Sequence, residues 1–199
     1  MSTVGRRFFE VAFLFEFGMG VVAVVIAWSF GLRLWNHFSV DSASLGVSIV
    51  ATGLALLFYL LLRSLPFACF RRTVDLVRAI FRSELQSLPT WKLALLALAA
   101  GFGEELLFRG LLQKGLCNLS DGNEPIIIVA VSLLFGLLHC LSKTYVILAF
   151  LISVYLGLLF LWTDNLFVVI TVHALYDFVV LLHLRFERGS SATNDGASG

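Results

Sequence analysis

The chain has few charged residues and no excess of basic ones. Of its 199 residues 14% are charged, against about 25% in a soluble domain. The formal net charge is +1, and no pattern of basic and aromatic residues suggests a surface for nucleic acid. Hydrophobic residues instead make up 59% of the chain. This composition argues against an ordinary soluble domain and predicts an integral membrane protein of one compact helical domain.

A metal-binding cysteine motif and a signal-peptide cleavage site are also lacking. Cys69, Cys117 and Cys140 show no close spacing such as CxxC, so we interpret them as apolar filler or free thiols. Arg6 and Arg7 precede a long apolar stretch, as in a signal peptide, but this stretch has no small-residue cleavage site. We interpret it as a retained membrane span.

Six apolar stretches approach the roughly 20 residues that a membrane-spanning helix needs. The fold is therefore predicted to be all-α, a polytopic membrane helix bundle with about six transmembrane spans. The fourth and fifth stretches are short and nearly adjacent, which predicts a tight helical hairpin around residues 142–144. The expected spans are 11–32, 45–62, 91–112, 126–142, 145–162 and 165–184.

Basic residues predict which side of the membrane each loop faces, because Lys and Arg concentrate in cytoplasmic loops. Arg6 and Arg7 place the N-terminus inside, and Arg185 and Arg188 follow the last of six spans on the same side. We therefore expect an integral protein of the plasma (inner) membrane with both termini in the cytoplasm. Residues 1–188 form one membrane domain in this prediction. A Gly-, Ser-, Ala- and Asn-rich tail at 189–199 is predicted to be disordered.

The loop between the second and third spans contains an amphipathic pattern at residues 66–89. Arginines occupy one face of the helix that this pattern predicts. Such a helix is typical of one that lies on an anionic leaflet. The alternative is a helix packed on the protein's own cytosolic face. The apolar residues that recur at three- and four-residue steps are Phe67, Phe70, Val74, Val77, Phe81, Leu85 and Leu88.

Two carboxylates and an arginine lie inside the third apolar stretch. Placing such groups in lipid costs roughly 2.5–3.5 kcal/mol each, and they mark functional sites by default. Glu105 and Arg109 are four residues apart, so they share one helix face and are expected to form a structural pair. Glu104 points about 100° away from them. It is therefore the carboxylate that remains free for chemistry. Glu10 and Glu16, near the start of the first span, are given no catalytic role.

Two histidines complete the set of polar residues in apolar segments. His173 and Asp177 are four residues apart, so Asp177 can accept a ring N–H and set the tautomer. Glu104 follows Lys92 by 12 residues and His173 precedes Arg185 by 12, which places both about 18 Å from the cytosolic edge. His139 fits this depth less well, since it is close to the hairpin turn. Either the hairpin tip is sunk below the surface or the fourth span is tilted.

These three segments resemble the motifs of the CPBP family of CAAX proteases and bacteriocin-processing membrane proteins, which includes the type II CAAX prenyl endopeptidases. The family pattern is EExxxR, then FxxxH, then HxxxN or HxxxD, on successive core helices. The resemblance covers roughly residues 90–185, the expected protease core. The matching runs are Glu104-Glu105-Leu106-Leu107-Phe108-Arg109, Phe135-Gly136-Leu137-Leu138-His139 and His173-Ala174-Leu175-Tyr176-Asp177.

The resemblance implies an intramembrane endopeptidase. Glu104 and His139 would activate a water molecule, and His173 with Asp177 would bind the oxyanion or the scissile carbonyl. The implied substrate is a membrane-associated or lipid-proximal peptide or protein, with membrane lipids as further partners and no nucleic acid. A structural supporting role is implied for Glu105, Arg109 and Phe135.

The metal requirement stays open at this point. The resemblance is compatible with a metal-free glutamate mechanism and with a zinc protease. Asp177 cannot donate a hydrogen bond unless protonated, as the Asn of other members can, and is better suited to orient His173 or to bind a metal. The four groups nevertheless lack a short spacing signature such as HExxH. We expect no cofactor, with zinc as the alternative, held by Glu104, His139, His173 and Asp177.

Two other functions are considered. Carboxylate–histidine chains at mid-membrane also form proton relays, so a proton-coupled transporter is one alternative. The chain shows no repeated halves, and six spans are few for such a transporter. The second alternative is a catalytically silent family member that serves as an immunity or binding scaffold. The intact motifs argue against it.

Overall fold

The computed structural model describes residues 3–119 and 123–186, and within these ranges the chain is helical and forms no strand. The all-α prediction is therefore confirmed. The tail at 189–199, which was predicted to be disordered, lies outside the described residues. The helices are α1 (Thr3–Ser29), the short 3-10 helix η1 (Leu34–His37), α2 (Ser42–Ser64), α3 (Ala68–Ser87), α4 (Thr90–Glu105), the π-helix η2 (Leu106–Gln113), α5 (Lys114–Leu119), α6 (Glu124–Leu138), α7 (Lys143–Thr163) and α8 (Leu166–Phe186).

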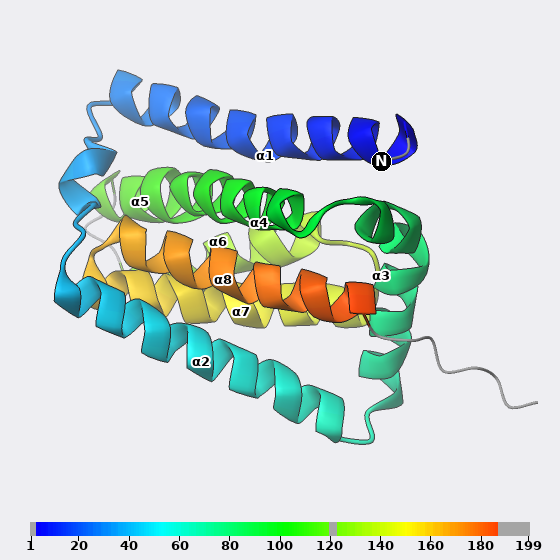
Figure 1. Ribbon diagram of the computed structural model, residues 1–199. Helices are drawn as coiled ribbons and strands as arrows, with labels where there is room; N and C mark the ends of the chain where they lie inside the picture. Colours follow the sequence, from blue (N-terminus) through cyan, green and yellow to red (C-terminus); the bar gives the residue numbers. More distant parts are fainter. Residues whose placement is uncertain (1–2, 120–122, 187–199) are drawn as a thin grey trace, which may run out of the picture.

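The helices form a bundle around α4 and α8, which pack extensively against each other. Helix α1 covers α4 on one side of the bundle, and α2 packs against α8 on the other. Helices α6 and α7 pack against each other as the predicted hairpin. Figure 1 shows α3 crossing one end of this bundle, while the connection from α1 to α2 lies at the opposite end. The functional motifs on α4, α6 and α8 are thereby brought together inside the bundle.

Within residues 3–119 and 123–186 four helices, α1, α2, α7 and α8, are long and apolar enough to cross a membrane. Side chains on their outer faces, such as Val11, Leu14 and Ile49, are exposed, as expected of lipid-facing residues. The fourth expected span corresponds to α6, which has only 15 residues. The third is divided, since α4 ends at Glu105 and continues directly as η2 and α5. The protein is thus an integral membrane protein with four long apolar helices, and the count of six spans stays a prediction.

Helix α3 is amphipathic as predicted, but its apolar face is turned toward the protein. Phe70 and Leu85 are buried, and Val77 and Phe81 pack against a cluster that includes Leu184 of α8. Helix α3 therefore packs on the protein itself, as in the alternative considered for residues 66–89. The ends of α1 and α8 offer an apolar surface that this helix covers. The exposed face carries three arginines, Arg71, Arg72 and Arg82.

Two glycines allow α4 to approach both of its neighbours closely. A Cβ atom on Gly103 would lie 1.9 Å from the carbonyl oxygen of Glu16 in α1. A Cβ atom on Gly101 would lie 2.8 Å from the carbonyl oxygen of Ile170 and 2.9 Å from the backbone nitrogen of Ala174, both in α8. Small residues permit this close approach of membrane helices. The contact with α8 brings Glu104 next to His173.

The turn between α6 and α7 is held by α3. Ser142 is the N-cap of α7, and its Oγ accepts the Tyr145 backbone N–H at 3.1 Å. The same Oγ lies 3.1 Å from Oγ1 of Thr73 in α3. The hairpin tip is therefore covered by α3, and the two arrangements considered for His139 stay predictions.

Candidate active site

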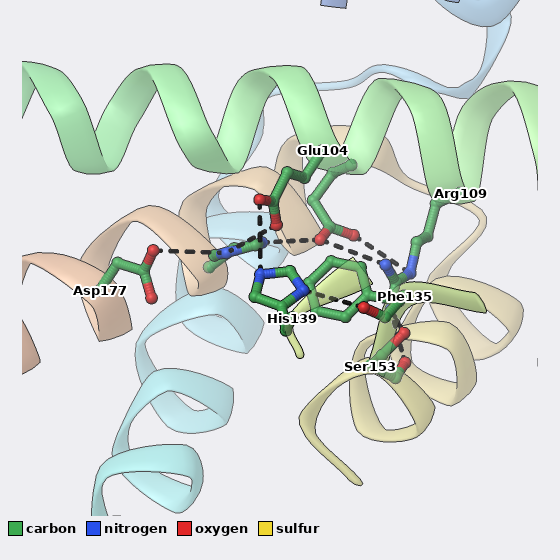
Figure 2. A network of polar contacts seen from close by, with 8 residues as sticks. Glu104, Arg109, Phe135, His139, Ser153 and Asp177 are labelled. Carbon is green, nitrogen blue, oxygen red and sulfur yellow. Dashed lines mark hydrogen bonds and ion pairs between the residues drawn. The ribbon is translucent and has the colours of Figure 1, made fainter. Parts of the chain in front are cut away.

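Three helices bring one carboxylate and two imidazoles together, as Figure 2 shows. Glu104 Oε1 lies 3.8 Å from Nε2 of His139, and Glu104 Oε2 lies 3.6 Å from Nε2 of His173. These separations are longer than direct hydrogen bonds. The polar atoms of the three groups therefore keep bonding capacity for a water molecule or a substrate. We call Glu104, Glu105, Arg109, His139, His173 and Asp177 the site cluster.

Glu105 and Arg109 form the predicted pair and are both completely buried. Arg109 Nε lies 3.2 Å from Glu105 Oε2, an ion pair that lacks hydrogen-bond alignment, while Nη1 approaches Oε1 at 3.4 Å. Nη2 donates to the carbonyl oxygen of Ser153 and, at 2.9 Å, to its Oγ. The guanidinium also lies over the ring of Phe135, 5.6 Å from its centroid. Arg109 thus ties α7 to the helix that carries both glutamates.

Glu105 also holds His173. Its Oε1 lies 2.7 Å from Nδ1 of His173. Because Glu105 is paired with Arg109, it is an ionised acceptor, so Nδ1 carries the proton. The opposite nitrogen, Nε2, then faces Glu104 and lies 3.5 Å from Asp177 Oδ2. From the spacing within α8, Asp177 was predicted to accept the ring N–H of His173 and so to set its tautomer. The shorter contact with the ring comes instead from Glu105. Spacing along one helix does not reveal a competing acceptor on another helix.

His139 is fixed by its own helix. Its Nδ1 lies 2.8 Å from the carbonyl oxygen of Phe135. Because a carbonyl oxygen can only accept a hydrogen bond, Nδ1 carries the proton and donates it. The other nitrogen, Nε2, therefore presents its lone pair to Glu104. The imidazole stacks on the Phe135 ring, with centroids 4.4 Å apart and planes 24° apart. Phe135 itself is packed edge-on against Phe108. This aromatic contact holds His139 at the C-terminal end of α6.

The π-helix η2 begins directly after Glu105. At its end the Lys114 N–H bonds the Arg109 carbonyl, five residues earlier. π-Helical stretches are rare and are found frequently at functional sites. The sequence analysis did not predict this change of helix type.

The site cluster opens into a cavity of about 260 Å³. Residues of α3 form one wall of this cavity, so the helix that crosses one end of the bundle also covers the candidate site. Sequence reasoning missed three tyrosines in the cavity lining, because they lie on separate helices with no common spacing. Its lining residues are Tyr59, Phe70, Thr73, Val74, Val77, Phe81, Glu104, Phe135, His139, Tyr145, Leu148, Ala149, Ile152, His173, Tyr176, Asp177, Val180, Leu181 and Leu184.

The geometry does not converge on a metal centre. In the described part of the chain, no group of three or more His, Cys, Asp or Glu side chains is arranged so that it could hold a metal ion. One nitrogen of each imidazole faces a protein acceptor, Phe135 O for His139 and Glu105 for His173. The other nitrogen of each imidazole, Nε2, faces Glu104. No reaction step is therefore assigned to a metal.

Residues 86–179 match the family model of the Rce1-like proteins, described as type II CAAX prenyl endopeptidase Rce1-like. The matched segment runs from the end of α3 into α8 and contains every member of the site cluster. The predicted similarity to the type II CAAX prenyl endopeptidases is thereby confirmed. This similarity supports a peptide hydrolase of the CAAX-protease type in general.

The chain is also similar to a protein of Bacillus subtilis (strain 168) described as uncharacterized protein YpbD. The two are 41% identical over 95 residues, which are 46% of this chain and 45% of the relative. The similarity thus spans less than half the length of that curated relative. No solved structure matches the chain.

Proposed function

We propose that this protein is an intramembrane endopeptidase that hydrolyses a peptide bond of a membrane-associated or lipid-proximal peptide or protein. The observation that carries the proposal is the position of Glu104. Its two oxygens face imidazole nitrogens from two other helices, at distances of 3.6 and 3.8 Å, on the wall of a cavity. A carboxylate that is held among polar partners without being satisfied by them is suited to act on a third molecule.

In the proposed reaction Glu104 is the general base. It takes a proton from water as the water oxygen attacks the carbonyl carbon, and the carbonyl electron pair moves to the oxygen. The Nε2 lone pair of His139 accepts the second water hydrogen and orients the nucleophile. When the tetrahedral intermediate collapses, the carbonyl forms again and the C–N bond breaks. The leaving amine takes the proton back from Glu104.

His173 is proposed to bind the oxygen of the scissile carbonyl. Glu105 fixes its Nδ1–H, so a doubly protonated ring directs Nε2–H toward the cavity. The carboxylates of Glu105 and Asp177, at 2.7 and 3.5 Å from the ring nitrogens, balance the positive charge of that form. A donor preorganised in a site with little water stabilises developing negative charge more strongly than water does.

The side chains that line the cavity indicate which residues the substrate carries beside the scissile bond. Most of its lining side chains are aliphatic or aromatic, so the residues beside the scissile bond are expected to be apolar. We propose that the enzyme lies in the plasma (inner) membrane with both termini in the cytoplasm. In this orientation the exposed arginines of α3 face the anionic leaflet.

The test is cleavage of a quenched fluorogenic library of transmembrane peptides by the purified protein in proteoliposomes. Replacing Glu104 by Gln is expected to lower kcat by about 10³-fold or more, because the general base is lost. Glu124→Gln is the matched control, since Glu124 is exposed in the first turn of α6, away from the site cluster. Cleavage that survives Glu104→Gln would overturn the mechanism. Proton flux in the same liposomes without any cleavage would favour the transporter.

We further propose that hydrolysis needs no metal. Activity is expected to survive dialysis against a strong chelator, with no stoichiometric zinc in the purified protein. Loss of activity on chelation, together with its recovery on adding zinc, would contradict this proposal. It would then assign Glu104, His139, His173 and Asp177 as candidate ligands.

A further inference from the structure

The proposed reaction requires hydrogen-bond donors at the developing oxyanion, and Asp177 is not one of them. An ionised carboxylate only accepts hydrogen bonds, and Asp177 already lies beside Nε2 of His173. His173 supplies one donor. Oxyanion sites commonly use two or more preorganised donors. We therefore expect a second donor in the wall of the cavity.

Tyr145 is a candidate because it lies next to the catalytic groups. It belongs to the first turn of α7 and lines the same cavity as Glu104 and Asp177. Its ring centroid is 5.9 Å from that of His139. Among the hydrogen bonds found within residues 3–119 and 123–186, none uses the Tyr145 hydroxyl. The O–H is therefore available to a molecule in the cavity.

The other two tyrosines of the cavity, Tyr59 and Tyr176, contact aromatic rings other than that of His139. The rings of Tyr59 and Tyr176 pack edge-on against each other, with centroids 6.3 Å apart. Tyr59 also contacts Phe70 and His183. Tyr145, by contrast, has its ring beside that of His139.

The backbone of Tyr145 is held by the N-cap of α7. Its N–H donates to the capping Oγ of Ser142, and that Oγ contacts Thr73 of α3. His139 precedes the same turn and is fixed by Phe135. The hairpin turn therefore sets the positions of the imidazole that orients the water and of the phenol beside it. A tyrosine also has only two side-chain torsions to fix, which suits a preorganised donor.

We propose that Tyr145 donates its phenolic O–H to the oxyanion, alongside Nε2–H of His173. This assignment rests on the proposed peptidase function. In the attack step the carbonyl electron pair moves to the oxygen, and the phenol donates a hydrogen bond to that oxygen without transferring its proton. When the carbonyl forms again the hydrogen bond weakens. Tyr145 thus acts as a catalytic residue whose contact is strongest in the transition state.

The test is Tyr145→Phe, which removes only the hydroxyl. With the peptide substrate in proteoliposomes, kcat is expected to fall about 10²–10³-fold, the range seen when one oxyanion donor is removed. KM is expected to stay nearly unchanged, because the lost contact is made in the transition state. A kcat within a few-fold of the unmodified protein would overturn the assignment.

Two phenylalanine variants serve as controls. Tyr176→Phe lies in the same cavity and should keep kcat within a few-fold. Tyr155→Phe loses a hydrogen bond to the Ala51 carbonyl, 2.8 Å away, outside the cavity lining. It therefore reports the general effect of losing a half-buried, hydrogen-bonded hydroxyl. A kcat loss in Tyr155→Phe equal to that in Tyr145→Phe would also overturn the assignment.

A second measurement separates catalysis from folding. A peptide phosphinate carries an anionic oxygen in the place of the oxyanion and resembles the tetrahedral intermediate. Tyr145→Phe should weaken phosphinate binding by about the same factor as it lowers kcat/KM. Unchanged phosphinate binding would contradict the proposal. If Glu104→Gln is inactive while Tyr145→Phe is fully active, only the tyrosine assignment fails. If Glu104→Gln is active, the proposed mechanism fails, and if the unmodified protein cleaves no peptide, the proposed function fails.

Discussion

Two polar clusters in the described part of the molecule are built differently, one inside the bundle and one at the end where α1 is connected to α2. The second, which we call the loop cluster, consists of His37, Ser39, Lys114, Asp164 and Asn165. The Asp164 carboxylate lies 3.0 Å from Lys114 Nζ and 2.9 Å from His37 Nδ1. Asn165 donates to the Ser39 carbonyl and hydroxyl oxygens, both at 2.9 Å. Each of these groups has a direct partner, so the loop cluster fastens the α1–α2 connection, the α7–α8 turn and the start of α5 together.

The site cluster combines two arrangements in adjacent residues. Glu105 is completely buried and contacts Arg109 and His173 at 3.2 and 2.7 Å. Glu104 makes only the longer approaches of 3.6 and 3.8 Å. Polar groups that stabilise a fold satisfy one another, whereas a group that reacts must keep bonding capacity. The comparison therefore predicts that stability and activity depend on different members of the site cluster.

The largest loss of stability is expected from Arg109→Met. The change leaves the carboxylate of Glu105 buried without its cation, which costs about 3–5 kcal/mol. Thermal unfolding in detergent measures the loss, and activity should fall with it. Adding Glu105→Gln to the same chain should recover part of the stability, because the unpaired charge is removed. If Arg109→Met alone unfolds like the unmodified protein, the pair does not hold the bundle together.

The next largest effect is expected from Gly101→Ala. The new Cβ would meet backbone atoms of Ile170 and Ala174 at 2.8 and 2.9 Å, and overpacking of this kind costs about 1–3 kcal/mol. Cleavage activity should also fall, since α8 must move away from α4 and carry His173 from Glu104. Gly53→Ala is the matched control in α2, where a Cβ meets nothing within 4 Å. Equal effects of the two changes on unfolding would refute the role of the close contact.

A smaller effect is expected in the loop cluster from Asp164→Asn. Asp164 has a positive φ of 46°, which Asn tolerates as well as Asp does, so the variant removes the charge without straining the backbone. The side chain is more than half exposed, so the loss should be about 1 kcal/mol or less. Unfolding in detergent, with activity as the second readout, should show a small loss of stability at neutral pH and unchanged cleavage.

The loss of stability in Asp164→Asn should also depend on pH. Burial raises the pKa of Asp164, but hydrogen bonds from Lys114 and His37 outweigh it and hold the pKa below its ordinary value. The pKa of Asp164 is lower in the folded protein than in the unfolded chain, where it is about 3.9. The ion pair therefore stabilises the folded protein at pH values above the unfolded pKa. It is lost as the pH falls through the folded pKa. The difference between the unmodified protein and Asp164→Asn should therefore vanish in acid. A difference that grows in acid would contradict the ion-pair explanation.

The smallest change in stability is expected from Glu104→Gln, although it has the largest effect on activity. Glu104 is buried without a direct hydrogen bond from either imidazole, so removing its charge should leave the unfolding temperature unchanged or raise it slightly, as at other active sites. Glu124→Gln provides the baseline for an exposed glutamate. A destabilisation as large as that of Arg109→Met would show that Glu104 is a structural residue.

Several features could be predicted from single segments of the sequence. The positions of α1, α2, α7 and α8 could be predicted from the apolar stretches, because each of these helices contains its own run of hydrophobic residues. Helix α1 begins at Thr3, earlier than the expected start at residue 11, because Arg6 and Glu10 pair at 2.8 Å and extend the helix beyond its apolar part. The contact between Glu105 and Arg109 was also predictable, because it follows from spacing within one turn.

The sequence by itself therefore determined the membrane-helix class, the three motifs and the pairs that meet along one helix, since these depend on the order of residues in a single segment. Only the tertiary structure decided that Glu105 rather than Asp177 makes the shorter contact with His173, that α3 covers the cavity, and that Tyr145 lies beside His139. Each of these depends on the relative placement of separate helices. That placement is set by close backbone contacts such as those at Gly101 and Gly103, which no spacing within one helix encodes.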